Sequence, residues 1–328
     1  MANSSRRVIQ VVSHGPSCFD GVVAAATVAR FYQGHRVLPI LAANGESDQK
    51  IQALRPKSNG EGDEVWITDL SWNSTATGEH LRSLADAGVS VYWIDHHRSA
   101  VSRADAPEFK VPFRGKVLSE RYSAARLTFN FLKRRAPKAA GSAARMKAFE
   151  RFFPIVELAD DHDRWVKRLP ASADWALAIQ TLGGAQAYRE ILRLDEPVMT
   201  ARLKAALEQG RAAMARSLEL ARATLIDTPL ANGLKVRSAC CFGYSSEVAA
   251  DLYKDQHQTV IALFDLRSQG VSLRRSPDCE VDLSETARSF GGGGHAAAAG
   301  FARGDLAQAP AQRLATILRG KLEAFSAR

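Results

Sequence analysis

The stretch "VYWIDHHRSA", residues 91–100, is an apolar run that ends abruptly in polar side chains. Residues 91–94 are apolar or aromatic, and Asp95, His96 and His97 follow directly. A buried carboxylate or imidazole loses its hydration, which costs free energy unless a charged or hydrogen-bonding partner replaces the water. The stretch therefore predicts a buried β-strand whose carboxyl end carries a polar site.

Two other apolar segments in the first half of the chain end in the same way. One ends at His14, with Asp20 six residues later, and another delivers Asp69. Residues 19–34 and 78–88, which lie between such segments, have the pattern of helices. Apolar strands that alternate with helices indicate an α/β fold with a parallel sheet covered on both faces. Because parallel strands end at one edge of the sheet, we expect these polar side chains to converge there.

The pattern changes twice further along the chain. Residues 186–226 have the pattern of one or two long helices, and strand patterns return after residue 235. The predicted organisation is an N-terminal parallel-sheet domain in residues 1–190, a helical connector in 191–229 and a smaller C-terminal α/β domain in 230–328.

Composition narrows the class of protein. The 328 residues are 46% hydrophobic and 24% charged, which is an ordinary globular composition. Lys plus Arg exceed Asp plus Glu by 44 − 35 = 9, which favours anionic ligands such as phosphates; a merely cationic, solvated surface is the alternative. Four cysteines without a CxxC spacing, and no apolar run near the ~20 residues of a membrane span, predict a soluble cytoplasmic protein that does not bind membranes.

The convergent carboxylates and imidazoles indicate a metal site. Left alone at one edge they would repel one another, and a divalent cation relieves that repulsion. The segment "ELADDHDRW", residues 157–165, offers further carboxylates to the same site. Such ligands suit Mn²⁺, Fe²⁺ or Mg²⁺ better than structural zinc, and two cations could promote a phosphoryl displacement. Taken singly, each residue could instead be a half-buried histidine or a helix N-cap, but their joint occurrence favours a site.

A second signal is "SFGGGGHAAAAGF", residues 289–301. Its glycines would let backbone amides approach an anion at the N-terminus of a helical run that restarts in the alanines, and a flexible linker is the alternative. Arg274 or Arg275, in the strand pattern just before it, could hold a phosphate in a bidentate manner.

The combination of these motifs resembles the DHH phosphoesterase superfamily. The similarity runs over nearly the whole chain, through "SHGPSCFDGVVAA", "ITDLS", "IDHH", "ADDHDRW", "SLRRS" and "GGGGHAAAAGF". Within this superfamily, the motifs resemble more specifically the branch with a C-terminal DHH-associated (GGGH) domain, which includes oligoribonucleases of the nanoRNase type. The resemblance implies a DHH catalytic domain in residues 1–190 and a substrate-binding domain in 230–328.

The resemblance also implies roles for individual residues. It assigns as metal ligands His14, Asp20, Asp69, His96 and Asp161, with Asp69 bridging two ions and Asp160 or Asp163 as alternatives to Asp161. Asp95 and His97 would orient ligands and water, and His97 would assist proton transfer. The groups implied in binding the terminal phosphate or sugar of the substrate are Arg274, Gly292, Gly293, Gly294 and His295.

One position departs from the family pattern. Many relatives have an aspartate four residues after the first-motif histidine, where this chain has Cys18. The segment "HGPSCFDG" is similar to a subgroup with the pattern HxxxCxDG. Cys18 could ligate as a thiolate and favour a softer ion, or leave the first metal weakly held.

The sequence thus predicts a Mn²⁺-dependent phosphoesterase with two ions, with Mg²⁺, Fe²⁺ or Co²⁺ as alternatives. Its expected reaction is 3′→5′ hydrolysis of short single-stranded oligonucleotides by water that the cations activate. The alternatives are another phosphate ester or anhydride as substrate (a linear dinucleotide, 3′-phosphoadenosine 5′-phosphate or polyphosphate) and a non-catalytic nucleic-acid-binding protein with a degenerate site. A symmetric homodimer is the default expectation for assembly.

Overall fold

The computed structural model describes residues 7–57, 62–135, 142–303 and 310–324. It divides into two compact units, an N-terminal unit of residues 1–210 and a C-terminal unit of residues 211–328. The division falls inside helix α10 (Ala201–Ala223), within the segment predicted as a connector. The limits and roles of the predicted domains stay predictions, and each unit is described by itself.

The N-terminal unit contains a five-stranded sheet in the order β2-β1-β3-β4-β5. Its strands are β1 (Val8–His14), β2 (Arg36–Ala42), β3 (Glu64–Thr68), β4 (Ser90–Asp95) and β5 (Gly115–Leu118). Every neighbouring pair is parallel, which confirms the predicted sheet. All residues of β3 are buried, as expected of a strand covered by helices on both faces.

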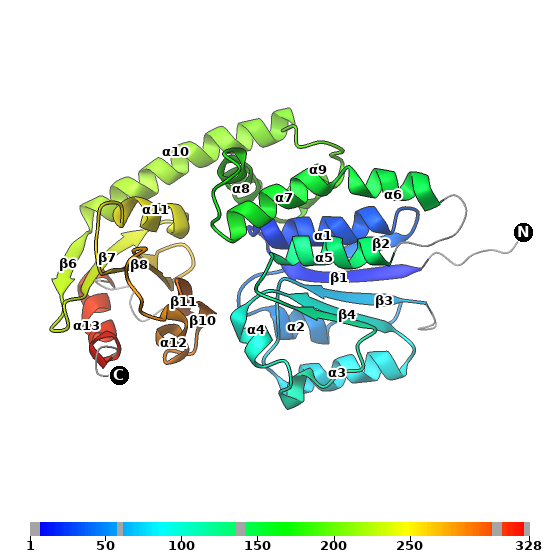
Figure 1. The fold of residues 1–328 in the computed structure, drawn as a ribbon, viewed down its shortest axis with the longest axis horizontal. Helices are drawn as coiled ribbons and strands as arrows, with labels where there is room; N and C mark the ends of the chain where they lie inside the picture. The colour runs from blue at the N-terminus through cyan, green and yellow to red at the C-terminus, as the bar shows by residue number, and fades with distance from the viewer. Residues whose placement is uncertain (1–6, 58–61, 136–141, 304–309, 325–328) are drawn as a thin grey trace, which may run out of the picture. The chain divides into compact units, whose positions relative to one another are not determined.

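Helices cover both faces of this sheet (Figure 1). They are α1 (Phe19–Phe31), α2 (Ser47–Gln52), α3 (Thr75–Asp86), α4 (Arg98–Ser102), the 3₁₀ turn η1 (Pro107–Phe109), α5 (Ala124–Arg134), α6 (Ser142–Glu150), α7 (Phe153–Asp163), α8 (Ala171–Leu182) and α9 (Gly184–Leu192). Helices α1, α5 and α7 lie against one another on one face, and α2 and α3 lie on the other. Beneath α3, the rings of Trp72, Trp93 and Phe109 pack together in the core.

The strand order places a switch point beside β1. The chain leaves β1 for β2 on one side and returns to β3 on the other. In open α/β sheets, ligands bind outside the carboxyl ends of the strands at such a point, because the connecting helices there diverge to opposite faces. His14 is the last residue of β1, and Asp69 directly follows β3. The fold alone therefore predicts that these two side chains lie at a ligand site.

The C-terminal unit contains a six-stranded mixed sheet in the order β10-β11-β9-β8-β7-β6. Its elements are β6 (Ile226–Pro229), β7 (Lys235–Cys241), α11 (Ser245–Leu252), β8 (Thr259–Asp265), β9 (Gly270–Arg275), α12 (Leu283–Arg288), β10 (Gly293–His295), β11 (Ala298–Ala302) and α13 (Pro310–Glu323). Strands β7 and β8 are parallel, and the other pairs are antiparallel. This second sheet confirms the predicted smaller α/β fold.

The prediction of a helical run after the four glycines is wrong. The segment forms a β-hairpin of β10 and β11, in which Gly293 pairs with Gly300. The glycines serve the close approach of two backbones, since a Cβ atom on Gly292 would lie 2.1 Å from the carbonyl oxygen of Gly300. The glycine amides are therefore not at the N-terminus of a helix, and the anion-binding argument based on one does not apply.

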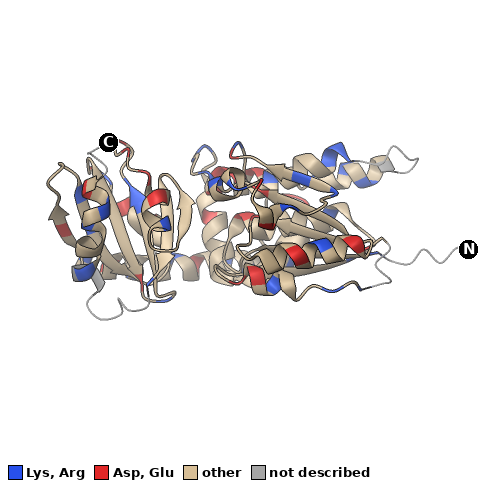
Figure 2. Cartoon of the chain, turned by 90° about the horizontal axis from the view of Figure 1, so that it is seen from below, with Lys and Arg blue, Asp and Glu red and all other residues tan. Residues whose placement is uncertain are grey.

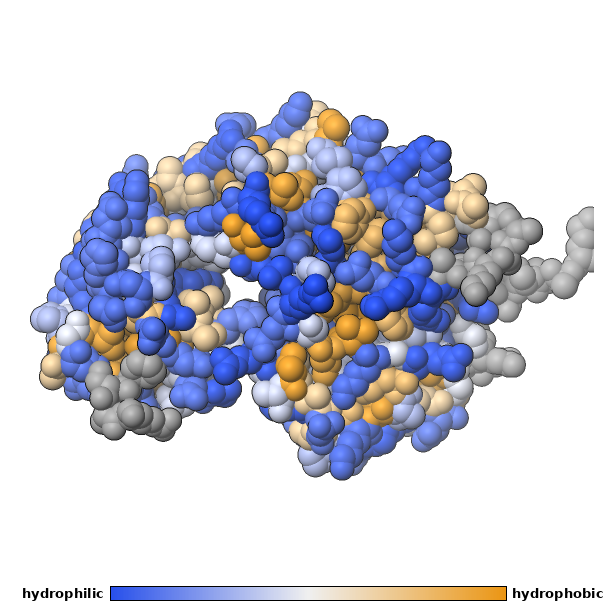
Figure 3. All heavy atoms as spheres, in the orientation of Figure 1, coloured by the Kyte–Doolittle hydropathy of each residue, from blue (hydrophilic) through white to orange (hydrophobic). Residues whose placement is uncertain are grey.

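The surface of both units is largely polar. In the view of Figure 2, basic and acidic residues alternate along the helices and do not gather in one region. Hydrophilic side chains cover most of the face seen in Figure 3. Within the described ranges, no helix has both the length and the apolar character needed to cross a membrane.

Candidate metal centre

The centre of the candidate site is Asp69, the first residue after β3. Its side chain is only 1% exposed, and its backbone adopts a left-handed φ of 57°, which aspartate tolerates better than most residues. Its amide donates to the carbonyl of Ile94 in the neighbouring strand. Because that bond fixes the turn, the carboxylate of Asp69 is held at the carboxyl edge of the sheet.

Two histidines lie on opposite sides of this carboxylate. The Nδ1 atom of His14 is 3.6 Å from Asp69 Oδ2, and the Nε2 atom of His96 is 3.2 Å from Asp69 Oδ1. Burial raises the pKa of Asp69, but the attraction of the two histidines outweighs burial and holds that pKa well below its usual value. Asp69 is thus an anion that faces two nitrogen atoms from different strands.

A second carboxylate, Asp20, faces the same region from helix α1. Its Oδ2 atom lies 3.9 Å from His96 Nε2. The backbone N–H groups of Ala124 and Ala125, at the start of α5, donate to its two oxygens at 2.8 and 3.0 Å. Burial raises the pKa of Asp20 well above its usual value, and the charges of Asp69 and Asp163 add to this. The chain therefore orients this carboxylate firmly but leaves its charge poorly compensated.

Among the three candidates on helix α7, Asp163 is the residue that faces the histidines. Its Oδ2 atom lies 3.4 Å from His96 Nε2, and its side chain is 24% exposed. Desolvation raises its pKa against the attraction of His96. With Asp20 and Asp69, it brings three carboxylates around one imidazole, and the pKa of His96 rises to about 11 because these charges outweigh the effect of its burial.

Asp161, the residue preferred from the sequence, does not face the histidines in this geometry. Its two oxygens accept hydrogen bonds from the backbone N–H of Arg168 and from the hydroxyl of Ser172, so they hold the loop that follows α7. Asp160 is also engaged elsewhere, with Oδ1 accepting from the backbone N–H of Ser123. Asp161 and Asp163 are two residues apart and point in different directions on the helix, whereas Asp160 is held by Ser123 and Arg164.

Asp95 and His97 form a pair beside the centre. Asp95 Oδ1 lies 2.7 Å from Nδ1 of His97, and the backbone N–H groups of His96 and His97 donate to the same oxygen. The hydroxyl of Ser71 donates to Oδ2 at 2.6 Å. Burial lowers the pKa of His97, but Asp95 outweighs it and raises that pKa to about 9. Asp95 thus fixes the ring of His97 and favours its protonated form.

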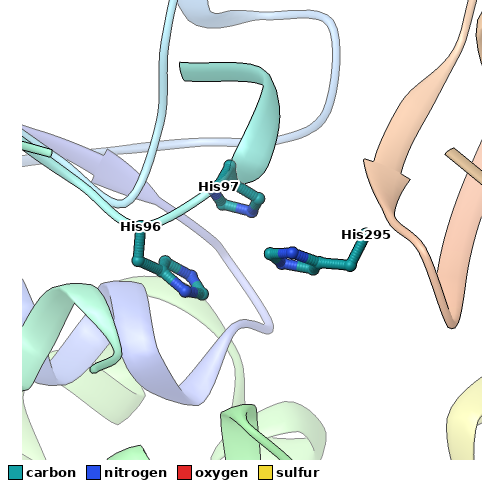
Figure 4. Close-up of side chains that lie close together, drawn as sticks. All are labelled: His96, His97 and His295. Atoms are coloured by element: carbon teal, nitrogen blue, oxygen red, sulfur yellow. The ribbon is translucent and has the colours of Figure 1, made fainter. Parts of the chain in front are cut away.

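Figure 4 shows His96 and His97 projecting from the end of β4, and their ring centroids are 4.6 Å apart. The figure also draws His295, which belongs to the C-terminal unit. His14, the remaining imidazole of the N-terminal cluster, has its Nε2 atom 3.0 Å from Oδ1 of Asn44.

Cys18 lies on the His14 side of Asp69. It is the N-cap of α1, where its Sγ atom accepts a hydrogen bond from the backbone N–H of Gly21, and its thiol donates to Asp69 Oδ2 at 3.3 Å. Burial raises the pKa of the thiol well above its usual value, and the nearby carboxylates add to this. Gly21 allows this packing, because a Cβ atom there would lie 2.0 Å from the carbonyl oxygen of His14.

These residues fit divalent cations. Ligand atoms of His14, Cys18 and Asp69 lie within 4.8 Å of one another, and so do those of Asp20, Asp69 and His96. The Oδ1 atom of Asp69 is buried and receives no hydrogen bond of good geometry from the described residues. A cation beside this oxygen would stabilise it together with the neighbouring carboxylates, which otherwise repel one another.

The predicted substrate-binding residues lie in the C-terminal unit. Arg274, on β9, donates to the hydroxyls of Ser246 and Ser272 at 2.8 and 3.0 Å and to the carbonyl of Leu273 at 2.8 Å. Burial lowers the pKa of this guanidinium. Gly293, Gly294 and His295 form strand β10, which Gly292 precedes, and Ala298 in the hairpin partner β11 pairs with Arg274. The structure therefore brings Arg274 and the hairpin into one sheet.

Sequence reasoning missed several residues that support the centre. Ser71 and Asn44 were not anticipated, because a lone serine or asparagine after a strand is common in any loop. Gly21 could have been noticed, since it directly follows Asp20 inside a helix pattern where glycine is unfavourable. That cost indicates a close backbone contact of the kind that His14 makes.

No protein-family model and no curated protein sequence matches the chain. Among solved structures, RecJ from Thermus thermophilus in complex with Mn²⁺ is similar over 98% of this chain and 52% of its own, with a TM-score of 0.54 and 19% identity. A protein described as the DHH domain of a member of the s1p family of ribosomal proteins is similar over 98% of this chain and 86% of its own, with a TM-score of 0.51 and 15% identity.

The chain spans about half the length of that RecJ chain. At such low identity, the likeness concerns the fold alone. The chain has the same fold as these structures, one of which is described as a DHH domain, and this confirms the fold expected from the sequence motifs.

Proposed function

We propose that the protein is a metal-dependent phosphoesterase that hydrolyses short oligonucleotides. The observation that carries the proposal is the arrangement around Asp69, whose buried carboxylate lies between His14 and His96 at the switch point of the sheet. Metal-assisted phosphoryl transfer needs such a shared carboxylate with further ligands on both sides. The solved RecJ structure with this fold is in complex with Mn²⁺, which supports manganese as the cation to test first.

Two groups of residues would hold the cations. His14, Cys18 and Asp69 would bind one, and Asp20, Asp69, His96 and Asp163 would bind the other. When bound, such cations lower the pKa of water and neutralise the charge of a phosphate. Carboxylate and imidazole ligands favour Mn²⁺, with Mg²⁺, Fe²⁺ and Co²⁺ as alternatives.

The chain's own residues would move the proton. Asp95 accepts the Nδ1–H of His97 and so fixes the orientation of the ring. Because Asp95 also stabilises the imidazolium, His97 can hold a proton beside the centre and donate it to the leaving oxygen of the substrate. Burial raises the pKa of Asp95, but His97 and then the hydroxyl of Ser71 outweigh it and hold that pKa below its usual value, which maintains this arrangement.

Residues of the C-terminal unit would bind the substrate's phosphate or sugar. Hydrogen bonds to Ser246, Ser272 and Leu273 fix the guanidinium of Arg274. A guanidinium held in this way recognises a phosphate with little loss of conformational entropy. We assign the same role to the β10 segment with Gly292, Gly293, Gly294 and His295, and the surplus of nine positive charges favours an anionic substrate.

The test is hydrolysis of single-stranded oligonucleotides of two to about thirty residues with Mn²⁺ added, because affinity for a chain end should make short substrates better. Nucleotide release that depends on Mn²⁺ and is abolished by Asp69→Asn supports the proposal. The same panel contains a linear dinucleotide, 3′-phosphoadenosine 5′-phosphate and polyphosphate. Hydrolysis of one of those alone would replace the oligonucleotide by that substrate, and binding of oligonucleotides without hydrolysis of any substrate would contradict the enzyme.

The remaining expectations from the sequence stay predictions. They are the narrower similarity to nanoRNase-type enzymes, the division into a catalytic and a substrate-binding domain, the cytoplasmic location and the homodimer.

A further inference from the structure

The residue that departs from the family pattern, Cys18, lies inside the cluster around Asp69. Its Sγ atom is 3.3 Å from Asp69 Oδ2, and ligand atoms of Cys18, Asp69 and His14 lie within 4.8 Å of one another. The sulfur of Cys18 therefore lies among potential metal ligands and does not point to an apolar neighbour.

The local backbone holds the sulfur in that position. Cys18 precedes the 13-residue helix α1 as its N-cap, and Sγ accepts a hydrogen bond from the amide of Gly21 at 3.4 Å. The N-terminus of a helix favours a negative charge, since its free amides carry partial positive charge. The amide of Gly21 thus fixes the direction of the sulfur, and because burial and the nearby carboxylates raise the pKa of the thiol, a cation beside it is what would favour the thiolate.

A second observation, independent of the cysteine, indicates a cation at the carboxylate of Asp69. Asp69 is 1% exposed, and its Oδ1 atom receives no hydrogen bond of good geometry from the described residues. On the other side of the same carboxylate, His14 Nδ1 lies 3.6 Å from Oδ2, while His14 Nε2 contacts Asn44. A nitrogen of His14, the sulfur of Cys18 and a carboxylate oxygen of Asp69 thus lie within 4.8 Å of one another, which is a donor set that suits a cation.

We propose that Cys18 binds one of the two cations as a thiolate, with His14 and Asp69, and makes this half of the site selective for thiophilic divalent cations such as Co²⁺, Fe²⁺ and Zn²⁺ over Mg²⁺. This inference rests on the metal centre of the proposed function. On binding, the S–H bond breaks, the sulfur keeps the electron pair and donates it to the cation, and the proton passes to solvent. The thiol that now donates to Asp69 would then be replaced by a metal–sulfur bond.

The selectivity follows from the softness of the ligand. Mg²⁺ and Mn²⁺ prefer oxygen ligands, whereas a thiolate binds the later divalent metals more strongly. A carboxylate at position 18 would instead favour cations that prefer oxygen ligands, such as Mg²⁺ and Mn²⁺. Cys18→Asp therefore changes the chemistry of the ligand while keeping a good N-cap for α1.

The experiment uses cobalt as a spectroscopic probe of the metal-free full-length chain. A Co²⁺–thiolate bond produces a sulfur-to-metal charge-transfer absorption band that oxygen and nitrogen ligands do not. Equilibrium dialysis with elemental analysis measures bound Co²⁺ and Mn²⁺ in parallel. The variants are Cys18→Ser, which keeps a capping hydroxyl, and Cys18→Asp, and circular dichroism with a thermal melt checks that each is folded.

The expected result is a charge-transfer band in the wild-type chain that saturates with one thiolate per chain and is absent from both variants. The three other cysteines, Cys240, Cys241 and Cys279, remain in those variants and serve as the internal control. The preference for Co²⁺ over Mn²⁺ should fall at least about tenfold in Cys18→Asp, by analogy with the loss when a group supporting a metal ligand is removed.

Two results would overturn the inference. The first is tight binding of Co²⁺ by the wild-type chain without the band, or with a band that survives in Cys18→Ser. The second is a preference for Co²⁺ that is the same in the wild type and Cys18→Asp. A band without hydrolysis of any phosphate ester would support the thiolate ligand while contradicting the proposed enzyme, so the two failures are distinguishable.

Discussion

The carboxylate of Asp163 lies 3.4 Å from Nε2 of His96, at the end of helix α7. Asp161, two residues earlier, instead accepts hydrogen bonds from Arg168 and Ser172. One short helix thus carries one carboxylate that faces the candidate metal centre and one that closes a loop. Substitutions of these two aspartates should therefore have different effects.

Asp163→Ala should lower the affinity for Mn²⁺ at least about tenfold while leaving the metal-free chain as stable as the wild type, because burial disfavours the charge of Asp163 and offsets its attraction to His96. Asp161→Ala should do the reverse, keeping the affinity and losing about 1–3 kcal/mol of unfolding free energy with its hydrogen bonds. Isothermal titration and urea unfolding measure the two quantities. Equal effects of both variants on affinity would contradict the assignment of Asp163.

Substitutions of the two adjacent histidines should also have different effects. His96→Asn should reduce Mn²⁺ binding, because His96 faces three carboxylates. His97→Asn should leave Mn²⁺ binding nearly intact and lower kcat by about 10²–10⁴-fold, as expected when a proton donor is lost. Steady-state kinetics at saturating Mn²⁺, with dialysis on the same preparations, provides the comparison. Loss of metal from His97→Asn would place that residue among the ligands.

Removal of metal should make the chain less stable. Cations that bind only the folded state stabilise it by about 2.7 kcal/mol at a free concentration of 100 times Kd. The melting temperature after chelation should therefore rise as Mn²⁺ is added back, and the rise should disappear in Asp69→Asn. A melting temperature that does not respond to Mn²⁺ in the wild-type chain would rule out a preformed centre.

Gly21→Ala should be among the most destabilising small substitutions in the chain. The new Cβ atom would lie 2.0 Å from the carbonyl oxygen of His14, so α1 must move away from β1, at a cost of about 3 kcal/mol or more. The matched control is Gly320→Ala in α13, where no atom lies within 4 Å and a gain of about 0.5–1 kcal/mol is expected. Chemical unfolding of both variants tests the contrast, and a Gly21→Ala chain as stable as the wild type would refute it.

The edge strand β6 carries a pH-dependent ion pair. Both oxygens of Asp227 accept hydrogen bonds from Arg237 on β7 at 2.7 Å, which lowers the pKa of Asp227. A carboxyl with a lowered folded-state pKa stabilises the fold above its unfolded pKa, and this contribution is lost as the pH falls through the folded value. The Asp227 side chain is 40% exposed, so Asp227→Asn should cost no more than about 1 kcal/mol at pH 7.

Urea unfolding of the wild-type and Asp227→Asn chains between pH 7 and pH 2 measures this difference. It should shrink toward zero at the acidic end, where the wild-type carboxyl is also protonated. A difference that stays constant with pH would show that packing, and not the ion pair, is responsible.

Much of the fold could be predicted from the sequence because the strands of the N-terminal unit are nearly continuous apolar runs. Those runs, and the polar residues directly after them, locate β1, β3 and β4 and the ligand candidates at their ends. Strand β5 (Gly115–Leu118) is short and only partly buried, so it lacks that signal. The glycine-rich hairpin was mistaken for a helix, since its alanines have a high helix propensity that strand pairing overrides.

The choice within "ELADDHDRW" could not be made from the sequence. Asp160, Asp161 and Asp163 are chemically identical, and only the packing of α7 decides which of them faces His96. The sequence also does not indicate that Asp20 accepts hydrogen bonds from two amides of α5, because the donors are 104 and 105 residues away. Contacts of that range depend on tertiary structure and leave no local pattern.

The same long separations have a consequence for biosynthesis. The candidate ligands run from His14 to Asp163, so a nascent chain that has emerged only as far as β4 contains the Asp-His-His motif but lacks the last carboxylate and the α5 amides that orient Asp20. The candidate metal centre can therefore be complete only after helix α7 has left the ribosome.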